Sequence, residues 1–177
     1  MENYETEKIE KTVLEMFSQR GYKNTRKENN CILAEYKSEE NGKDQTVCLF
    51  LTIIEQFKID NFKNYIALLN KKEIKHGIVL YKKITAFTKT AVHNTSSLKI
   101  LLETFQYTKL LYNITKHYLV PKHIRLSRQD AINFKKKHGT KIPKMISEDP
   151  VVKFYAFKKG DVIEIHRSDE VTYRIIK

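Results

Sequence analysis

The sequence predicts two domains, an α/β N-terminal domain over residues 1–115 and a small α+β domain over residues 116–177. Helical and strand periodicities alternate through the first part, which is typical of one sheet covered by helices. Near residues 115–119 the pattern starts again, and the rest of the chain has its own cap and turn signals. A chain of 177 residues is long enough for one or two modest cores.

The N-terminal domain is predicted to begin with an amphipathic helix over residues 5–20, followed by Gly21 as a stop signal. The apolar residues that recur at helical spacing on one face are Ile9, Val13, Met16 and Phe17. Residues 31–36 and 47–54 then favour strands, the second of them buried. Asn41-Gly42, between the two strands, is the strongest hairpin signal in the chain.

A second helix is expected after Asp60 or Asn61, either of which can cap it. Its inner face is predicted to contain Phe62, Tyr65, Ile66 and Leu69. Residues 77–81 form a short apolar strand in this interpretation, and a polar loop over residues 82–85 follows. Thr85 is a possible cap for a short helix, and residues 98–105 favour a strand over a helix.

The C-terminal domain has clear helix-cap and turn signals. A short strand over residues 124–126 precedes a helix that begins with a capping box from Ser127 to Asp130 and ends near Gly139. Asp149-Pro150 is a helix cap followed by proline at the first helical position. Strands over residues 162–166 and 171–176 form a final hairpin, so we expect a compact β-α-α-β-β unit.

The composition, with 41% hydrophobic and 11% aromatic residues, is that of a globular protein, and the net charge is +12. Excess positive charge favours a polyanionic partner, although a lysine-rich composition also serves simply to solvate a surface. Cys31 and Cys48 form no Cys-x-x-Cys pair, and no ligand cluster accompanies His117 and His123, so no metal or cofactor is expected.

No membrane partner is expected, because the longest apolar stretch, residues 47–54, is far shorter than the roughly 20 residues that span a bilayer. The first residues are acidic and polar, where a secretory signal has a basic stretch followed by an apolar run.

Several short motifs of the C-terminal domain occur in a distinctive order. They are Leu119–His123, Ile142-Pro143, Asp149–Val151, Lys159–Val162 and Thr172–Arg174. Their order and spacing resemble the assembly domain of the fifth subunit shared by the eukaryotic nuclear RNA polymerases, and the archaeal polymerase subunit that consists of this domain alone. Residues 110–117 resemble the segment that joins the eukaryotic jaw domain to that assembly domain. Residues 11–13, 20–22 and 76–80 resemble parts of the jaw domain itself.

This resemblance implies a non-catalytic subunit of a multisubunit DNA-directed RNA polymerase, located in the nucleus. The jaw of this family has a restriction-endonuclease-like core and lies near downstream DNA, and the assembly domain docks on the largest subunit. The resemblance therefore places eight residues at the subunit interface: Asn113, His117, Pro121, His123, Asp149, Pro150, Tyr173 and Arg174. Tyrosine and arginine are also residue types that interfaces favour.

The expected DNA-facing residues are Lys82, Lys83 and Lys89, on a basic loop that follows the apolar strand. Lysines offer point charges to phosphates, so this contact with double-stranded DNA is expected to be weak and non-specific. The family has a Thr-Pro-Ser-Ala turn here, where this chain has Ala86–Lys89, and the final hairpin is shorter than in most relatives. The Lys/Asn/Ile-rich composition suggests an AT-rich genome, either of a parasitic eukaryote or of a large DNA virus, whose subunit belongs in the cytoplasm or virion.

Two other functions remain open at this stage. A divergent nuclease needs an Asp ahead of a Glu-x-Lys motif to hold a divalent metal. Glu35-Tyr36-Lys37 has the second part, but the first Asp of the chain, Asp44, comes after it. A free-standing basic nucleic-acid-binding protein explains the net charge but not the two-part resemblance.

Overall fold

The computed structural model describes residues 2–37, 44–94, 99–139 and 141–177. The chain divides into two compact units, Met1–Tyr112 and Asn113–Lys177, whereas the sequence placed the boundary after residue 115. Each unit has its own sheet. None of the helices in the described ranges has the length and apolar character needed to cross a membrane.

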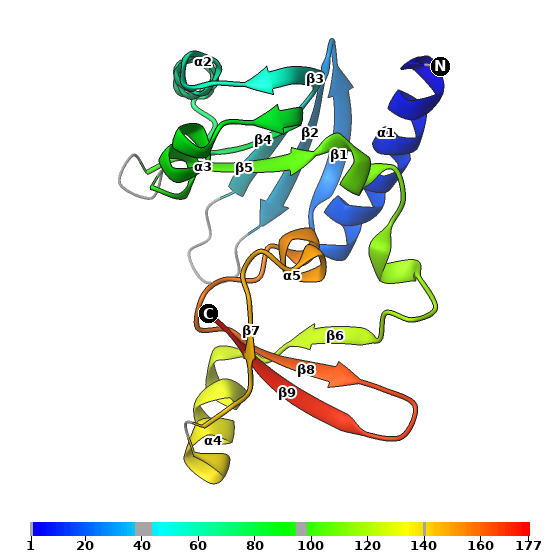
Figure 1. Cartoon of the computed structure of the whole chain (residues 1–177), viewed down its shortest axis with the longest axis vertical. Helices are drawn as coiled ribbons and strands as arrows, with labels where there is room; N and C mark the ends of the chain where they lie inside the picture. The colour runs from blue at the N-terminus through cyan, green and yellow to red at the C-terminus, as the bar shows by residue number, and fades with distance from the viewer. Residues whose placement is uncertain (1, 38–43, 95–98, 140) are drawn as a thin grey trace. The chain divides into compact units, whose positions relative to one another are not determined.

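The first unit is built on a five-stranded mixed sheet in the order β1-β2-β3-β4-β5 (Figure 1). Its elements are α1 (Glu2–Gln19), β1 (Lys23–Glu28), β2 (Cys31–Lys37), β3 (Asp44–Phe57), α2 (Ile59–Lys71), β4 (His76–Ile84), α3 (Ala86–His93), β5 (Leu101–Gln106) and the 3-10 turn η2 (Tyr107–Leu110). The strands β1, β2 and β3 pair antiparallel, whereas β3, β4 and β5 run parallel.

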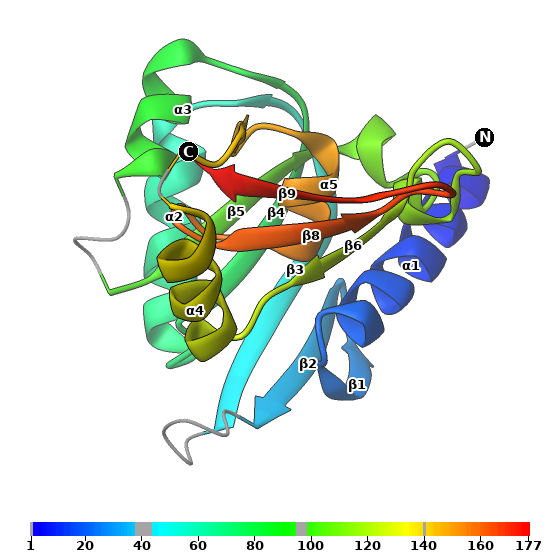
Figure 2. The ribbon, with the colours of Figure 1, turned by 90° about the horizontal axis from the view of Figure 1, so that it is seen from below.

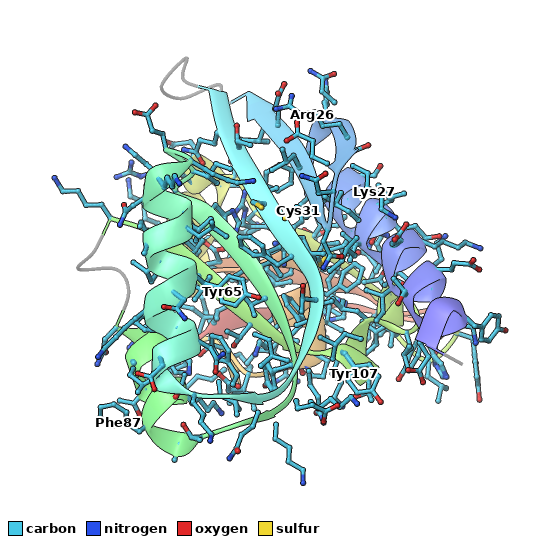
Figure 3. All side chains as sticks on the ribbon, turned by 90° about the horizontal axis from the view of Figure 1, so that it is seen from above. Arg26, Lys27, Cys31, Tyr65, Phe87 and Tyr107 are labelled. Carbon is cyan, nitrogen blue, oxygen red and sulfur yellow. The ribbon has the colours of Figure 1, made fainter. Side chains whose placement is uncertain are left out.

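Helices cover both faces of this sheet. Figures 1 and 2 show α1 on one face and α2 and α3 on the other. All four apolar residues predicted for the inner face of α1 are fully or almost fully buried. On the opposite face, the ring of Tyr65 points from α2 toward the sheet, 4.7 Å from the ring of Phe50 (Figure 3). A Cβ atom at Gly77 would lie 2.6 Å from Cδ1 of Leu69, so glycine permits this close approach of α2 to β4.

The first helix, the strands over 31–36, 47–54 and 77–81, and the Thr85 cap are confirmed. The prediction of the second helix cap was wrong, because α2 begins after Lys58 and Asn61 lies in its first turn. There the Asn61 Oδ1 atom accepts the Lys58 backbone N–H at 3.0 Å. The expected polar loop over residues 82–85 was also wrong, since β4 continues to Ile84. Asn41-Gly42 lie outside the described residues.

The second unit contains η3 (Ile114–Lys116), β6 (Lys122–Arg125), α4 (Arg128–His138), β7 (Lys144–Met145), α5 (Pro150–Tyr155), β8 (Val162–His166) and β9 (Val171–Ile176). Its four-stranded sheet has the order β6-β8-β9-β7, with β7 parallel to β9. The helices, the Ser127 and Asp149 caps and the final hairpin are confirmed. The short strand β7 was not predicted. A small core of Val152, Ile163, Ile165 and Ile176 holds the unit together.

Candidate subunit interface

An open groove in the second unit brings together four of the eight residues expected at the interface. Its volume is about 450 Å³. The lining residues are Leu119, Val120, Pro121, His123, Lys144, Met145, Ile146, Asp149, Val151, Ile165, Arg167 and Arg174. We call this the β6–β7 groove, because the residues of β6 and β7 and the segments next to them supply most of its lining.

Local hydrogen bonds fix the polar residues of the β6–β7 groove. The His123 Nδ1–H donates to the carbonyl oxygen of Pro121 at 2.7 Å. Burial lowers the pKa of His123, and nearby Arg167 lowers it further, against the opposing effects of the Pro121 carbonyl and of Asp149. The ring is therefore neutral at neutral pH.

Asp149 caps the helix that follows it. Its Oδ1 atom accepts the backbone N–H groups of Val151 at 2.8 Å and Val152 at 3.4 Å, at the start of α5. Pro150 occupies the first helical position, where its missing N–H costs nothing, and it does not line the groove. The Asp149-Pro150 pair thus shapes one wall of the groove through the start of α5.

A second, shallower groove contains Tyr173 and shares Arg174 with the first. Its volume is about 350 Å³, and we call it the Tyr173 groove. The Tyr173 ring lies 4.2 Å from that of Phe134 on α4, and Phe134 stacks on His138 at 4.6 Å. The Tyr173 hydroxyl donates to Glu164 on the neighbouring strand at 3.2 Å. An aromatic row therefore joins α4 to the sheet.

The remaining expected interface residues, Asn113 and His117, lie in neither groove. Asn113 is buried, and its Oδ1 atom accepts the Thr115 backbone N–H at 3.0 Å and the Thr115 hydroxyl at 2.6 Å. It therefore starts η3. His117 is exposed, stacks on Tyr118 at 4.8 Å, and accepts the Leu119 backbone N–H on its Nδ1 at 3.3 Å. These interactions shape the segment between η3 and β6.

The three expected DNA-facing lysines do not share a loop. Lys82 and Lys83 are consecutive residues of β4, so their side chains point to opposite faces of the sheet. Lys82 forms an ion pair with Glu55 on β3. Lys89 lies on α3, which begins after the Thr85 cap. The expectation of one basic loop was wrong because the strand continues through both lysines.

A buried polar network in the first unit was not predicted from the sequence. The two terminal guanidinium nitrogens of Arg20, Nη1 and Nη2, each donate to one Glu103 oxygen at 2.9 Å. The His76 Nε2 lies 2.6 Å from Glu103 Oε1, and the Tyr22 hydroxyl lies 3.0 Å from His76 Nδ1. The motifs at residues 20–22 and 76–80, which carry the jaw resemblance, therefore meet at Glu103.

Burial and charge oppose each other in this network. Burial disfavours the charged form of Glu103, but the Arg20 guanidinium and the bond from His76 outweigh it and hold the pKa of Glu103 below its usual range. Burial raises the pKa of Tyr22 to about 12, despite the lowering effect of Arg20. The network therefore fastens the segment that follows α1, which holds Arg20 and Tyr22, to β4 and β5 through an ionised Glu103 and a neutral Tyr22.

Glu35 of the Glu-x-Lys motif forms cross-strand polar contacts with the neighbouring strand β1. Glu35 accepts from Arg26 at 2.9 Å and from Asn24 at 3.2 Å, both on the edge strand β1. Both oxygens of the Glu35 carboxylate thus already have partners on β1. Within the described ranges, no group of three or more His, Cys, Asp or Glu side chains has the arrangement of a metal site.

Comparison with known proteins agrees with the resemblance seen in the motifs. The family model described as RNA polymerase Rpb5, C-terminal domain, matches residues 112–176. The DNA-directed RNA polymerases I, II, and III subunit rpabc1 of Dictyostelium discoideum is 31% identical over 186 aligned residues, which cover 94% of each chain. The chain belongs to the RNA polymerase Rpb5 family.

A viral protein aligns with the chain to a similar extent. The putative DNA-directed RNA polymerase subunit 454R of Invertebrate iridescent virus 6 is 30% identical over 177 aligned residues, 92% of this chain and 95% of the viral one. Both alignments therefore span the two units. The family match begins at residue 112, next to the start of the second unit at Asn113.

Proposed function

We propose that the chain is a non-catalytic subunit of a multisubunit DNA-directed RNA polymerase. The observation that carries this proposal is the length of the match. A protein named as a subunit of RNA polymerases I, II and III aligns with 94% of the chain, and the chain covers 94% of that protein. A shared motif on an unrelated module would give a much shorter alignment, which argues against a free-standing nucleic-acid-binding protein.

In this proposal the second unit is the assembly domain, which docks on the largest polymerase subunit. Its family match and its two grooves support that role. Pro121, His123, Asp149 and Arg174 line the β6–β7 groove, and Tyr173 lines the Tyr173 groove, so five of the expected interface residues lie on grooved surface. Asn113, His117 and Pro150 act on the same surface by shaping the segments that bear it.

The first unit is the jaw in this proposal, with a restriction-endonuclease-like core that lies near downstream double-stranded DNA. A mixed sheet with helices on both faces supports that core. Lys83 and Lys89 are exposed and suit weak, non-specific contact with phosphates. Lys82 is held by Glu55 and contributes less. Nuclear location follows for a cellular polymerase, and cytoplasm or virion for a viral one.

The test separates the roles of the two units. Tagged fragments of residues 113–177 and 1–112, with the full chain as positive control, are expressed in the source cell and isolated through the tag. The C-terminal fragment begins at Asn113 because this buried side chain starts η3, and a cut at residue 116 would remove it. We expect mass spectrometry to find the largest subunit with the full chain and with 113–177. Recovery with 1–112 and not with 113–177 would contradict the assignment of roles.

A further inference from the structure

We propose that the β6–β7 groove binds an acidic peptide segment with aliphatic side chains, supplied by another subunit of the polymerase. This inference rests on the proposed function, because that function supplies the source of the peptide. The groove itself lies wholly within the second unit. Its charge, its apolar lining and its hydrogen-bonding groups each point to this occupant.

The charge of the groove is unbalanced. Lys144, Arg167 and Arg174 line it, and within the described parts of the chain no carboxylate pairs with any of these three side chains. Other cations of the same unit do have such partners, since Arg125 lies 3.8 Å from Asp161 and Lys153 lies 3.9 Å from Glu148.

The single acidic residue of the groove lining does not balance these three cations. Asp149 directs its Oδ1 atom to the backbone N–H groups at the start of α5. A partner that brings carboxylates to Lys144, Arg167 and Arg174 would neutralise the positive charge of the groove. Interfaces commonly place a positive patch against a negative one.

The apolar lining favours a peptide over a nucleic acid. Met145, Val151 and Ile165 belong to the groove wall, and the aliphatic residues Leu119 and Ile146 are 70% and 67% exposed beside them. Exposed aliphatic groups of this size gain by burial against a protein partner. The described residues that line the groove include no Phe, Tyr or Trp, which are the large rings that form the usual stacking platforms for single-stranded nucleic acids.

His123 adds a hydrogen-bonding group without adding charge. Its Nδ1–H is committed to the Pro121 carbonyl, which leaves Nε2 of the neutral ring as an acceptor. A backbone N–H of an extended peptide can donate to such an atom. The groove thus offers cations to acidic side chains, apolar walls to aliphatic side chains, and an acceptor to the peptide backbone.

The test uses the full chain and synthetic fluorescent peptides. The probe alternates Asp or Glu with Leu or Ile. One peptide analogue replaces every acidic residue with Lys, and another replaces every aliphatic residue with Ser. An oligo-thymidine strand serves as a polyanion that is not a peptide. The variant is Arg167→Glu with Arg174→Glu. The matched control is Lys136→Glu with Lys137→Glu, which makes the same charge change at exposed positions of α4 outside the groove. Circular dichroism verifies that both variants are folded.

We expect the acidic peptide to bind the wild-type chain, and the groove variant to bind it about tenfold more weakly or worse. The control variant and wild type should bind alike, and both peptide analogues should bind more weakly than the probe. Equal binding by the groove variant, or no binding by wild type, would overturn the proposal. Oligo-thymidine binding that is tighter than peptide binding, and that the groove variant weakens while the control variant does not, would make the groove a nucleic-acid site instead.

A parallel isolation of the tagged full-length chains from the source cell keeps the two proposals separate. If wild type brings down polymerase subunits but the acidic peptide does not bind, the groove proposal fails and the proposed function stands. If wild type brings down no polymerase subunit, the proposed function fails, and the source assigned to the peptide fails with it. When both proposals hold, the groove variant recovers less polymerase than the control variant does.

Discussion

Replacing Glu103 with Gln tests the buried ion pair that fastens Arg20, the residue after α1, to β5. Both oxygens of Glu103 accept from Arg20 at 2.9 Å, and the side chains of Arg20 and Glu103 are only 3% and 15% exposed. The amide leaves the Arg20 charge buried without its counterion. Removing one partner of such a pair costs about 3–5 kcal/mol. Glu28→Gln is the control, because Glu28 is 49% exposed and its pair with Arg26 contributes about 0–1 kcal/mol.

The same substitution should change how stability depends on pH. The pKa of Glu103 lies below its usual range in the folded chain, so the ionised carboxylate stabilises the fold above the unfolded pKa of about 4.3. That stabilisation is lost as pH falls below this value toward the folded pKa. Wild type should therefore lose stability across this acidic range, and Glu103→Gln should lose less over the same range because it has no carboxylate to protonate.

Hydrogen exchange of the peptides from β4 and β5, measured in increasing urea at neutral and acidic pH, reports the stability of the first unit directly. The reasoning is refuted if Glu103→Gln stays within about 0.5 kcal/mol of wild type, the range typical of surface substitutions. It is also refuted if the acid dependence of the two proteins is the same.

Three further outcomes are expected. Asp149→Ala should destabilise the second unit by about 1 kcal/mol in urea denaturation, because α5 loses its cap. In alkaline denaturation followed by circular dichroism, wild type should lose stability as pH rises from 10.0 toward about 12, since the folded pKa of Tyr22 is raised, and Tyr22→Phe should lack this part of the decline. Replacing Lys82, Lys83 and Lys89 with Ala should lower the slope of log affinity for DNA against log salt by about 0.9 for each phosphate that these lysines neutralise. Because Lys82 and Lys83 point to opposite faces, at most two such phosphates are expected, and an unchanged slope would place the DNA-binding surface elsewhere.

Elements with strong local signals could be predicted from the sequence. The four apolar positions of α1 recur at helical spacing, and Ser127, Asp149 and Thr85 are caps whose side chains bond to the helices they start. In β8 of the final hairpin, Ile163 and Ile165 are buried, whereas Glu164 and His166 are half-buried. These elements are determined by residues close together in the sequence, so the sequence alone predicts them.

Elements that depend on distant partners were missed. All six residues of β1 are exposed, so its sequence has no alternation of apolar and polar residues that would predict a strand. The strand forms because it pairs with β2. β7 has two residues and depends on β9. Lys82 and Lys83 look like loop residues, yet pairing with β3 continues as far as Ile84. Tertiary pairing overrides local preference in each case.

In the candidate sites too, local motifs could be predicted from the sequence, whereas contacts between distant residues could not. The motifs at residues 119–123 and 149–151 were recognisable, but only the fold brings Pro121 and Asp149 to one groove with Arg174. The Arg20–Glu103 pair joins residues that are 83 positions apart, and no local pattern indicates such a pairing. Lys144, Arg167 and Ile146 had no sequence signal at all, because their place in the groove depends on the packing of β7 and β9.

The central claim is that this chain is a subunit of a polymerase, and the stoichiometry of the natural complex tests it most directly. The polymerase is isolated from the source cell or virion through a tag on its largest subunit, resolved by size, and quantified by mass spectrometry. We predict that this chain elutes with the polymerase in an amount equal to that of the largest subunit. Its absence from the polymerase peak, with the chain eluting separately at its own mass of 21.0 kDa, would contradict the account.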